Sequence, residues 1–136
     1  MSTPSHHGHM LIFRGTDWYQ GLSPEQMQQV FDQWMTWFNR LKDEGIALAG
    51  NPLEPVGKIV AGRNRVVSDG PFAESKESIG GYFLLNVATL DEAVAIAKDC
   101  PGLPHGIRVE VRPVAPQCPI ADEIGVRSQH ASLAHA

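Results

Sequence analysis

The sequence of residues 82–113 is YFLLNVATLDEAVAIAKDCPGLPHGIRVEVRP, and it predicts a complete strand–helix–strand unit. Residues 82–88 form a nearly continuous apolar run, which is typical of a buried strand. Thr89 and Glu92 then match the Thr-x-x-Glu capping box that starts a helix, and apolar residues recur along one face of that helix. The Pro-Gly-Leu-Pro segment that follows ends the helix, which we expect over Thr89–Cys100.

The strand that closes this unit, residues 107–113, alternates between apolar and charged side chains. Because successive side chains of a strand point to opposite faces of the sheet, the apolar and charged residues are expected on different faces. The apolar set is Ile107, Val109 and Val111, and the charged set is Arg108, Glu110 and Arg112. We therefore expect one face of the sheet to pack against the core and the other to carry charge.

A longer helix is expected upstream, over Ser23–Glu44. Ser23 can act as the N-cap, Pro24 suits the first helical position, and Gln26 completes a Ser-x-x-Gln capping box. Gly45 is placed to end the helix in the left-handed conformation. Apolar side chains recur at helical spacing between these signals, at Met27, Val30, Phe31, Trp34, Trp37, Phe38 and Leu41.

Three aromatic residues of this helix, Trp34, Trp37 and Phe38, have two interpretations. They could stack on a bound cofactor, or they could pack into the core. Because they belong to the apolar face that the helix has to bury, core packing is the expected role. The sequence shows neither a phosphate-binding glycine loop nor zinc-type spacing of Cys and His, so it predicts no cofactor and no metal site.

The remaining strand segments are short. Met10–Arg14 precedes the long helix, residues 46–55 follow it, and residues 56–62 and 65–70 are expected to form a hairpin. Strands and helices therefore alternate as two split β–α–β units. This order predicts an α+β fold, a ferredoxin-like sandwich in which an antiparallel sheet carries both helices on one face.

Length and composition limit the organisation and the partners of the chain. With 136 residues, one domain is expected over residues 10–119, with a disordered leader at 1–9 and a tail at 120–136. The net charge of −4 argues against a nucleic-acid partner, and no apolar run is long enough to cross a membrane. Two cysteines, Cys100 and Cys118, favour a cytoplasmic protein with free thiols, although one bridge between them stays open.

The charged face of the last strand predicts a partner. Arg108, Glu110 and Arg112 are expected beside Tyr82 of the preceding strand. Because mixed aromatic and charged faces are often covered by a second subunit, we expect a homodimer whose two sheets face each other. The enclosed cavity could hold a small-molecule ligand, and the guanidinium groups of Arg108 and Arg112 would suit an anionic group.

The stretch SDGPFAESKESIGGYFLLNVATLDEAVAIAKDCPGLPHGIRVEVRPV, residues 68–114, resembles the DGPF-type members of the YCII-related family. The likeness extends over residues 10–119 and includes LSPEQMQ at the long helix and the specific nine-residue motif DGPFAESKE. The resemblance implies a dimeric α+β barrel. Members of the wider family have been proposed to be small enzymes with a His–Asp pair, and many DGPF-type members have no assigned activity. DGPF-type proteins are also associated with extracytoplasmic-function sigma factors, which implies a regulatory partner.

The DGPF loop has two interpretations. Asp69 could project its carboxylate into the mouth of the dimer cavity, where Glu74, Lys76 and Glu77 would gate or bind a polar ligand. Alternatively, the Asp-Gly-Pro sequence only turns the chain, Phe72 fills a gap in the core, and the charged side chains stay in water.

His105 is the second candidate for proton transfer, because an unperturbed imidazole titrates near neutral pH. A lone histidine in a loop is also compatible with a solvated side chain. The family pattern rests on the glycine and the VEVRPV segment near His105 more than on the histidine itself. Because the family pattern does not depend firmly on this histidine, the resemblance gives only weak support for a His–Asp pair formed by His105 and Asp69.

Two functions from different classes follow. The first is a cofactor-independent enzyme, isomerase- or lyase-like, that acts on a small polar or aromatic compound, with Asp69 or His105 moving the proton. The second is a non-catalytic module that binds a ligand or regulates a sigma factor. The second function would be favoured if Asp69 faces solvent and neither His105 nor Arg108 or Arg112 lies near the same cavity.

Overall fold

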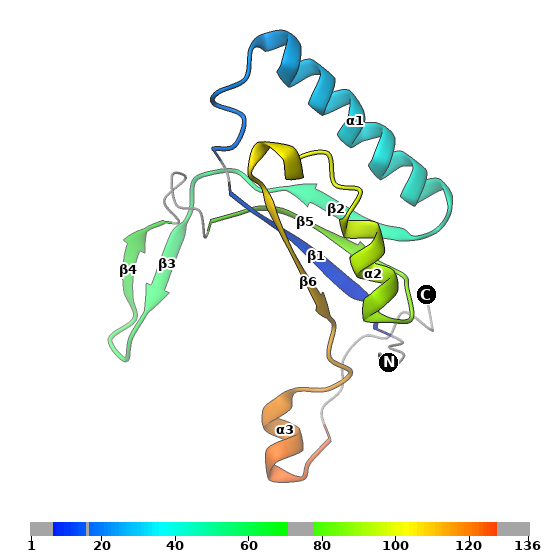
Figure 1. The fold of residues 1–136 in the computed structure, drawn as a ribbon. Coiled ribbons are helices and arrows are strands. Elements are labelled where there is room, and N and C mark those ends of the chain that lie inside the picture. The colour runs from blue at the N-terminus through cyan, green and yellow to red at the C-terminus, as the bar shows by residue number, and fades with distance from the viewer. Residues whose placement is uncertain (1–6, 16, 71–77, 128–136) are drawn as a thin grey trace.

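A computed structural model describes residues 7–15, 17–70 and 78–127 of the chain. In chain order, the elements are β1 (His9–Arg14), α1 (Pro24–Asp43), β2 (Ala47–Pro52), β3 (Lys58–Ala61), β4 (Val66–Asp69), β5 (Ile79–Leu85), α2 (Leu90–Ala97), the 3₁₀ turn η1 (Leu103–His105), β6 (Arg108–Pro113) and α3 (Pro119–Ile124). Figure 1 shows a main sheet with α1 and α2, and the hairpin of β3 and β4 projecting away from it.

The main sheet has four strands in the order β2-β5-β1-β6, and every neighbouring pair is antiparallel. Two β–α–β units, β1-α1-β2 and β5-α2-β6, interleave to give this order. The strands β3 and β4 form a separate two-stranded sheet, as expected for the hairpin. The predicted α+β, ferredoxin-like arrangement with an antiparallel sheet is confirmed.

The core lies on one face of the main sheet. Leu11 of β1 lies opposite Phe83 of β5 and Val111 of β6, so these three side chains point to the same side. Leu11 and Phe83 belong to the buried core cluster, and Val111 packs against it. The cluster also includes residues from two helices, namely Trp37 and Leu41 of α1 and Ala93 and Ala97 of α2. Both helices therefore cover the same face, as the sequence predicts.

The opposite face, here named the open face, carries the alternate residues of the same strands. Ile12 lies opposite Tyr82 and Glu110, and the neighbouring positions follow the same alternation. The open face comprises Met10, Ile12, Arg14, Tyr82, Leu84, Arg108, Glu110 and Arg112. It contains the charged set predicted from the last strand.

The helix α1 starts and ends at its predicted signals. The Gln26 N–H donates to Ser23 Oγ at 3.2 Å, and the Ser23 N–H donates to Gln26 Oε1 at 2.9 Å, so both halves of the capping box form. Gly45 follows the last turn with a φ of 76°, the left-handed conformation that glycine adopts without strain. Local signals therefore set the length of this helix.

One helix ends earlier than the sequence predicts, and one helix was not predicted. α2 ends at Ala97 rather than at Cys100: the chain tightens into a turn in which the Asp99 N–H donates to the Ile96 oxygen and the Cys100 N–H to the Ala97 oxygen, and Pro101 disfavours the helical conformation of Cys100. The aperiodic tail did not predict α3. Its signals are nevertheless present, since Pro119 occupies the first helical turn and Gly125 follows the helix with a φ of 73°.

The strand β1 begins at His9, one residue before the expected strand. The His9 side chain is 1% exposed, and its Nδ1 lies 3.1 Å from the carbonyl oxygen of Val87. The hydrogen bond links the start of β1 to the segment between β5 and α2. His9, which the sequence groups with the leader, therefore contributes to the packed side of the sheet.

Candidate functional site

A cavity of about 480 Å³ lies between α1 and the sheet, on the face that the helices cover. Its walls come from α1, the loop after β1, the end of β2 and the start of β5. The aromatic lining residues are Phe13, Trp18, Tyr19, Phe31, Trp34, Phe38 and Phe83, and the aliphatic ones include Met35, Leu53 and Ile107. The wall is thus mainly apolar and rich in rings.

The cavity arises because only part of the apolar face of α1 is buried in the core. Trp37 and Leu41, in the second half of the helix, are almost completely buried. Phe31 and Met35 belong to the same helix, yet they are 59% and 39% exposed and line the cavity. The apolar stripe that the sequence assigns to the core therefore serves two purposes, core packing and cavity lining.

Glycines on the sheet side of the cavity let aromatic rings approach the backbone. A Cβ atom at Gly50 of β2 would lie 2.6 Å from Phe83 Cδ1 and 2.8 Å from Phe38 Cε1. At Gly81 of β5, a Cβ atom would lie 3.0 Å from the carbonyl oxygen of Asn51. The two rings can therefore lie against β2, and β2 can lie close to β5, because neither glycine carries a side chain.

A second hollow of about 220 Å³ lies next to the cavity. Trp18, Tyr19, Phe31 and Trp34 line both spaces, so these four rings separate them. The remaining lining residues differ between the two. Among the methionines of α1, Met35 lines the larger cavity and Met27 lines the smaller hollow.

The ring of Trp18 occupies the middle of a short stack. Its centroid lies 6.0 Å from that of Trp34 with an interplanar angle of 19°, and 6.1 Å from that of His105 with an angle of 30°. The ring of Tyr19 meets Trp18 edge to face, at 5.7 Å and 87°. His105, one of the two predicted proton carriers, is thus a neighbour of the aromatic wall and not one of the residues that line the cavity.

Few groups in the cavity wall can carry chemistry. The residues that line it, within the described part of the chain, include no carboxylate, imidazole, amine, guanidinium or thiol. The side chains of the lining residues that carry polar groups are Tyr19, with its hydroxyl, and Trp18 and Trp34, with their indole N–H groups. Asn51 also lines the cavity, but it lies opposite Tyr82 in the register of β2 and β5, so its side chain is on the open-face side of the sheet. Such a wall can exclude water and stack on an apolar molecule, and it offers a few hydrogen bonds for orientation.

Asp69 lies on a different part of the molecule from His105. Asp69 ends β4 on the projecting hairpin, whereas His105 ends the turn η1 beside the main sheet, and these elements are far apart in Figure 1. The Asp69 side chain is 85% exposed, and its carboxylate forms an ion pair with Lys58 Nζ. The structure therefore places the predicted catalytic aspartate in solvent.

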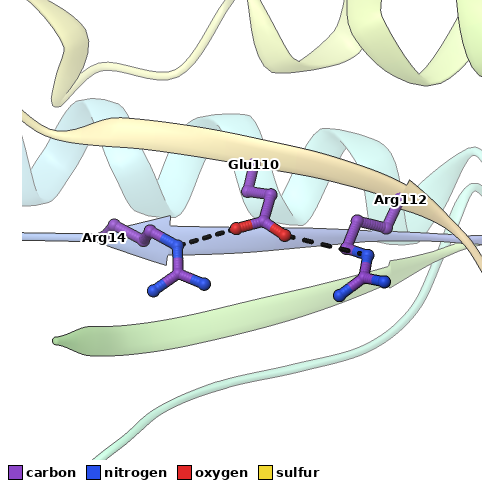
Figure 2. Close-up of polar contacts among 3 residues, drawn as sticks. All are labelled: Arg14, Glu110 and Arg112. Carbon is purple, nitrogen blue, oxygen red and sulfur yellow. Dashed lines mark hydrogen bonds and ion pairs between the residues drawn. The ribbon is translucent and has the colours of Figure 1, made fainter. Parts of the chain in front are cut away.

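The predicted binding residues Arg108, Glu110 and Arg112 lie on the open face, opposite the cavity. Figure 2 shows Glu110 between two arginines: Arg14 Nε lies 2.7 Å from Glu110 Oε1, and Arg112 Nε lies 3.7 Å from Glu110 Oε2. Arg14 lies directly opposite Arg108 in the register of β1 and β6. The Glu110 carboxylate therefore already balances part of the positive charge of the neighbouring arginines. The sequence did not predict that Arg14 belongs to this group.

Tyr82 and Lys76 complete the set of predicted binding residues. Tyr82 is half-buried on the open face, and Lys76 lies outside the described residues.

Cys100 and Cys118 are free thiols. Burial raises the pKa of Cys100 to about 11, against the opposing effect of hydrogen bonds with the Gly102 and Leu103 backbone. Cys100 is therefore protonated and unreactive near neutral pH.

Two further findings concern the described ranges 7–15, 17–70 and 78–127. Within them, no three His, Cys, Asp or Glu side chains gather in a group that could hold a metal ion. No helix in these ranges combines the length and the apolar character that a membrane crossing requires.

Sequence reasoning missed the cavity because its wall is assembled from distant segments. Trp18 and Tyr19 lie in the loop between β1 and α1, Met35 lies on α1, and Leu53 follows β2. Two local signals were present: the pair of adjacent aromatic residues in a loop, where large apolar side chains often mark a binding surface, and the stacking interpretation of Trp34 and Phe38 on the long helix.

Comparisons with known proteins bear on the family. The model of the YCII-related domain matches residues 10–116 of the chain. The uncharacterized protein R00369 of Rhizobium meliloti (strain 1021) is 47% identical to the chain over 51 residues, which is 37% of this chain. The match spans 41% of that relative's length. The predicted YCII relationship is thus confirmed.

Proposed function

We propose that this chain, which belongs to the YCII-related domain family, is a non-catalytic module that binds a small apolar molecule between α1 and the sheet. The observation that carries the proposal is the wall of the 480 Å³ cavity, which is built mainly from aromatic and aliphatic residues. Concave apolar sites with a few polar groups are the usual form of a small-molecule site, and this one has the size of such sites.

The distribution of titratable groups favours binding over catalysis. General acid–base catalysis requires a titratable group within hydrogen-bond reach of the reacting atoms. Asp69 is exposed on the hairpin, and the predicted arginines lie on the open face. We therefore favour the binding module over the isomerase- or lyase-like enzyme, which would need a proton carrier in the cavity.

A cavity-filling substitution tests the proposal. Met35→Trp is expected to weaken binding of the neutral fluorescent probe N-phenyl-1-naphthylamine by about tenfold or more, because the larger side chain occupies the cavity. Met27→Trp is a matched control, since Met27 lies on the same helix with a similar exposure, 38% against 39%, and lines only the smaller hollow. Probe fluorescence titrations measure both affinities. Equal affinities for the two variants, or no binding to the unmodified protein, would contradict the proposed function.

Three finer assignments belong to the same proposal. The DGPFAESKE motif supports membership of the DGPF-type group, and that group's association with extracytoplasmic-function sigma factors supports a regulatory role for the ligand-bound state. The two free thiols support a reducing, cytoplasmic location.

We further propose a homodimer that pairs the open faces of two copies. Apolar and charged side chains meet at the centre of this face, where Ile12 lies between Tyr82 and Glu110. The row Arg14–Glu110–Arg112 carries both signs of charge, so a two-fold axis can bring arginines of one copy near the glutamate of the other. This arrangement would leave the cavity between α1 and the sheet on the outer side of each subunit.

A charge at the centre of the open face tests the dimer. Light scattering of the unmodified protein at micromolar concentration is expected to give about twice the chain mass of 14.9 kDa. Ile12→Glu should raise the dimer dissociation constant about 100-fold or more, because it buries an added carboxylate directly opposite Glu110 in the interface. Val60→Glu, on the exposed hairpin, is the control and should remain dimeric. A monomeric unmodified protein would rule out the dimer.

A further inference from the structure

We propose that the cavity selects planar aromatic molecules, which stack on the face of Trp34 that Trp18 covers in this structure. The inference rests on the proposed function and adds the chemical class of the ligand. It follows from three features of the wall: the geometry of the ring stack, the unequal support of Trp18 and Trp34, and the position of both rings between the two hollows.

The ring stack shows that a flat group fits against Trp34. The planes of Trp18 and Trp34 differ by only 19°, and His105 lies on Trp18 at an angle of 30°. Most other ring contacts in this region are edge to face, such as Phe13 with Trp34 at 67°. A near-parallel slot therefore exists at one place in the wall, and offset stacking is a favourable geometry for aromatic pairs.

Trp34 is held from several sides. Its ring meets Phe13 at 5.1 Å and Trp37 at 5.8 Å, both edge to face. It also lies against the backbone of Gly102, where a Cβ atom would come within 2.9 Å of Trp34 Cζ3. Trp34 therefore forms a fixed platform on a long helix.

Trp18 has weaker support. It is half-buried in the loop between β1 and α1. Two backbone hydrogen bonds next to it, from Gln20 N–H to the Asp17 oxygen and from Leu22 N–H to the Tyr19 oxygen, stay within the loop. Segments with mainly local hydrogen bonds and partial exposure open at low free-energy cost. Trp18 is thus the movable member of the stack.

Movement of Trp18 would also enlarge the site. Trp18 and Trp34 both line the 480 Å³ cavity and the 220 Å³ hollow, so Trp18 is part of the partition between them. When it moves aside, the two spaces join next to the exposed face of Trp34. A fused-ring molecule can then stack on Trp34 and extend into the larger cavity, whereas a puckered saturated molecule of the same skeleton cannot match the slot.

The experiment compares 2-naphthol with its saturated analogue decahydro-2-naphthol by isothermal titration calorimetry. We expect the unmodified protein to bind 2-naphthol at least about fivefold more tightly, within the range that aromatic pairing contributes. Trp18→Ala should increase the affinity for 2-naphthol by about two- to tenfold, because it removes the ring that competes for Trp34, and should leave the affinity for the analogue nearly unchanged. Trp34→Leu should abolish the preference for the planar molecule.

The outcomes separate this inference from the proposed function. Equal binding of the two compounds would overturn planar selection and leave the binding module in place. If Trp18→Ala lowers the affinity for both compounds equally, Trp18 is a wall residue and not a displaceable cover, and the inference is overturned. If neither compound nor N-phenyl-1-naphthylamine binds, the proposed function fails as well. Circular dichroism checks that each variant folds. If Trp34→Leu does not fold, Trp34→Phe replaces it; this variant keeps a flat ring and should retain the preference for the planar molecule.

Discussion

Replacing Phe13 by alanine is expected to lower the free energy of unfolding by about 3–5 kcal/mol, the cost of removing a large buried aromatic side chain from a packed core. Phe13 is 3% exposed on the central strand β1. Its ring contacts those of Phe83 at 4.8 Å, Trp34 at 5.1 Å and Trp37 at 6.1 Å. The substitution leaves a void at the junction of α1 and the sheet, and the fixed rings around it cannot close the space. Denaturant unfolding measures the change.

Phe31→Ala is the matched control for this prediction. It removes the same side chain from the same region, but Phe31 is 59% exposed and contributes less to the core. We expect a loss of about 1 kcal/mol or less, since exposed apolar residues lose little burial when truncated. Similar losses for Phe13→Ala and Phe31→Ala would show that the aromatic cluster does not act as the core of the fold.

The second large effect is expected from Gly50→Ala, which should destabilise the protein by about 1–3 kcal/mol, the usual cost of an added group in a packed site. The new Cβ atom would lie 2.6 Å from Phe83 Cδ1 and 2.8 Å from Phe38 Cε1, well inside van der Waals contact. Both rings are packed against neighbours and line the cavity, so relief of the overlap has to move the floor of the site. Thermal unfolding and the probe titration should therefore change together.

Gly21→Ala provides the comparison for the glycine substitution. A Cβ atom at Gly21 would meet nothing within 4 Å, and the residue is not in the left-handed region. We expect a stability that is unchanged or up to about 1 kcal/mol higher, because alanine restricts the unfolded chain. A destabilisation by Gly21→Ala as large as that by Gly50→Ala would mean that the rings do not depend on the close approach at Gly50.

These predictions together show how the fold and the site share one set of aromatic residues. Phe13 and Phe83 belong to the buried core cluster and also form the cavity floor. Substitutions there would alter stability and binding at once, whereas Met35 and Trp18 lie at the periphery of the core. The periphery is therefore the place to test binding, and the core is the place to test the fold.

Local sequence signals were sufficient for most of the fold. The capping box at Ser23 and Gln26, together with Gly45, determines where α1 begins and ends, because each satisfies or terminates helical hydrogen bonding within a few residues. The alternation along residues 107–113 likewise determined which side chains lie on the open face, because a strand has a period of two. From this order of elements, the ferredoxin-like arrangement and its two faces could be predicted.

The site, in contrast, was decided by the tertiary structure. The sequence assigned Trp34 and Phe38 to the core, but how far α1 lies from the sheet depends on contacts with Phe83 and Gly50, which are remote in sequence. The same holds for Asp69 and His105: the pattern identified both as titratable residues in loops, and the packing put one on an exposed hairpin and the other against Trp18. Periodicity reports which face of an element is apolar, because it is a property of neighbouring residues. The empty space between two apolar faces depends on how distant segments meet, and only the folded chain brings those segments together.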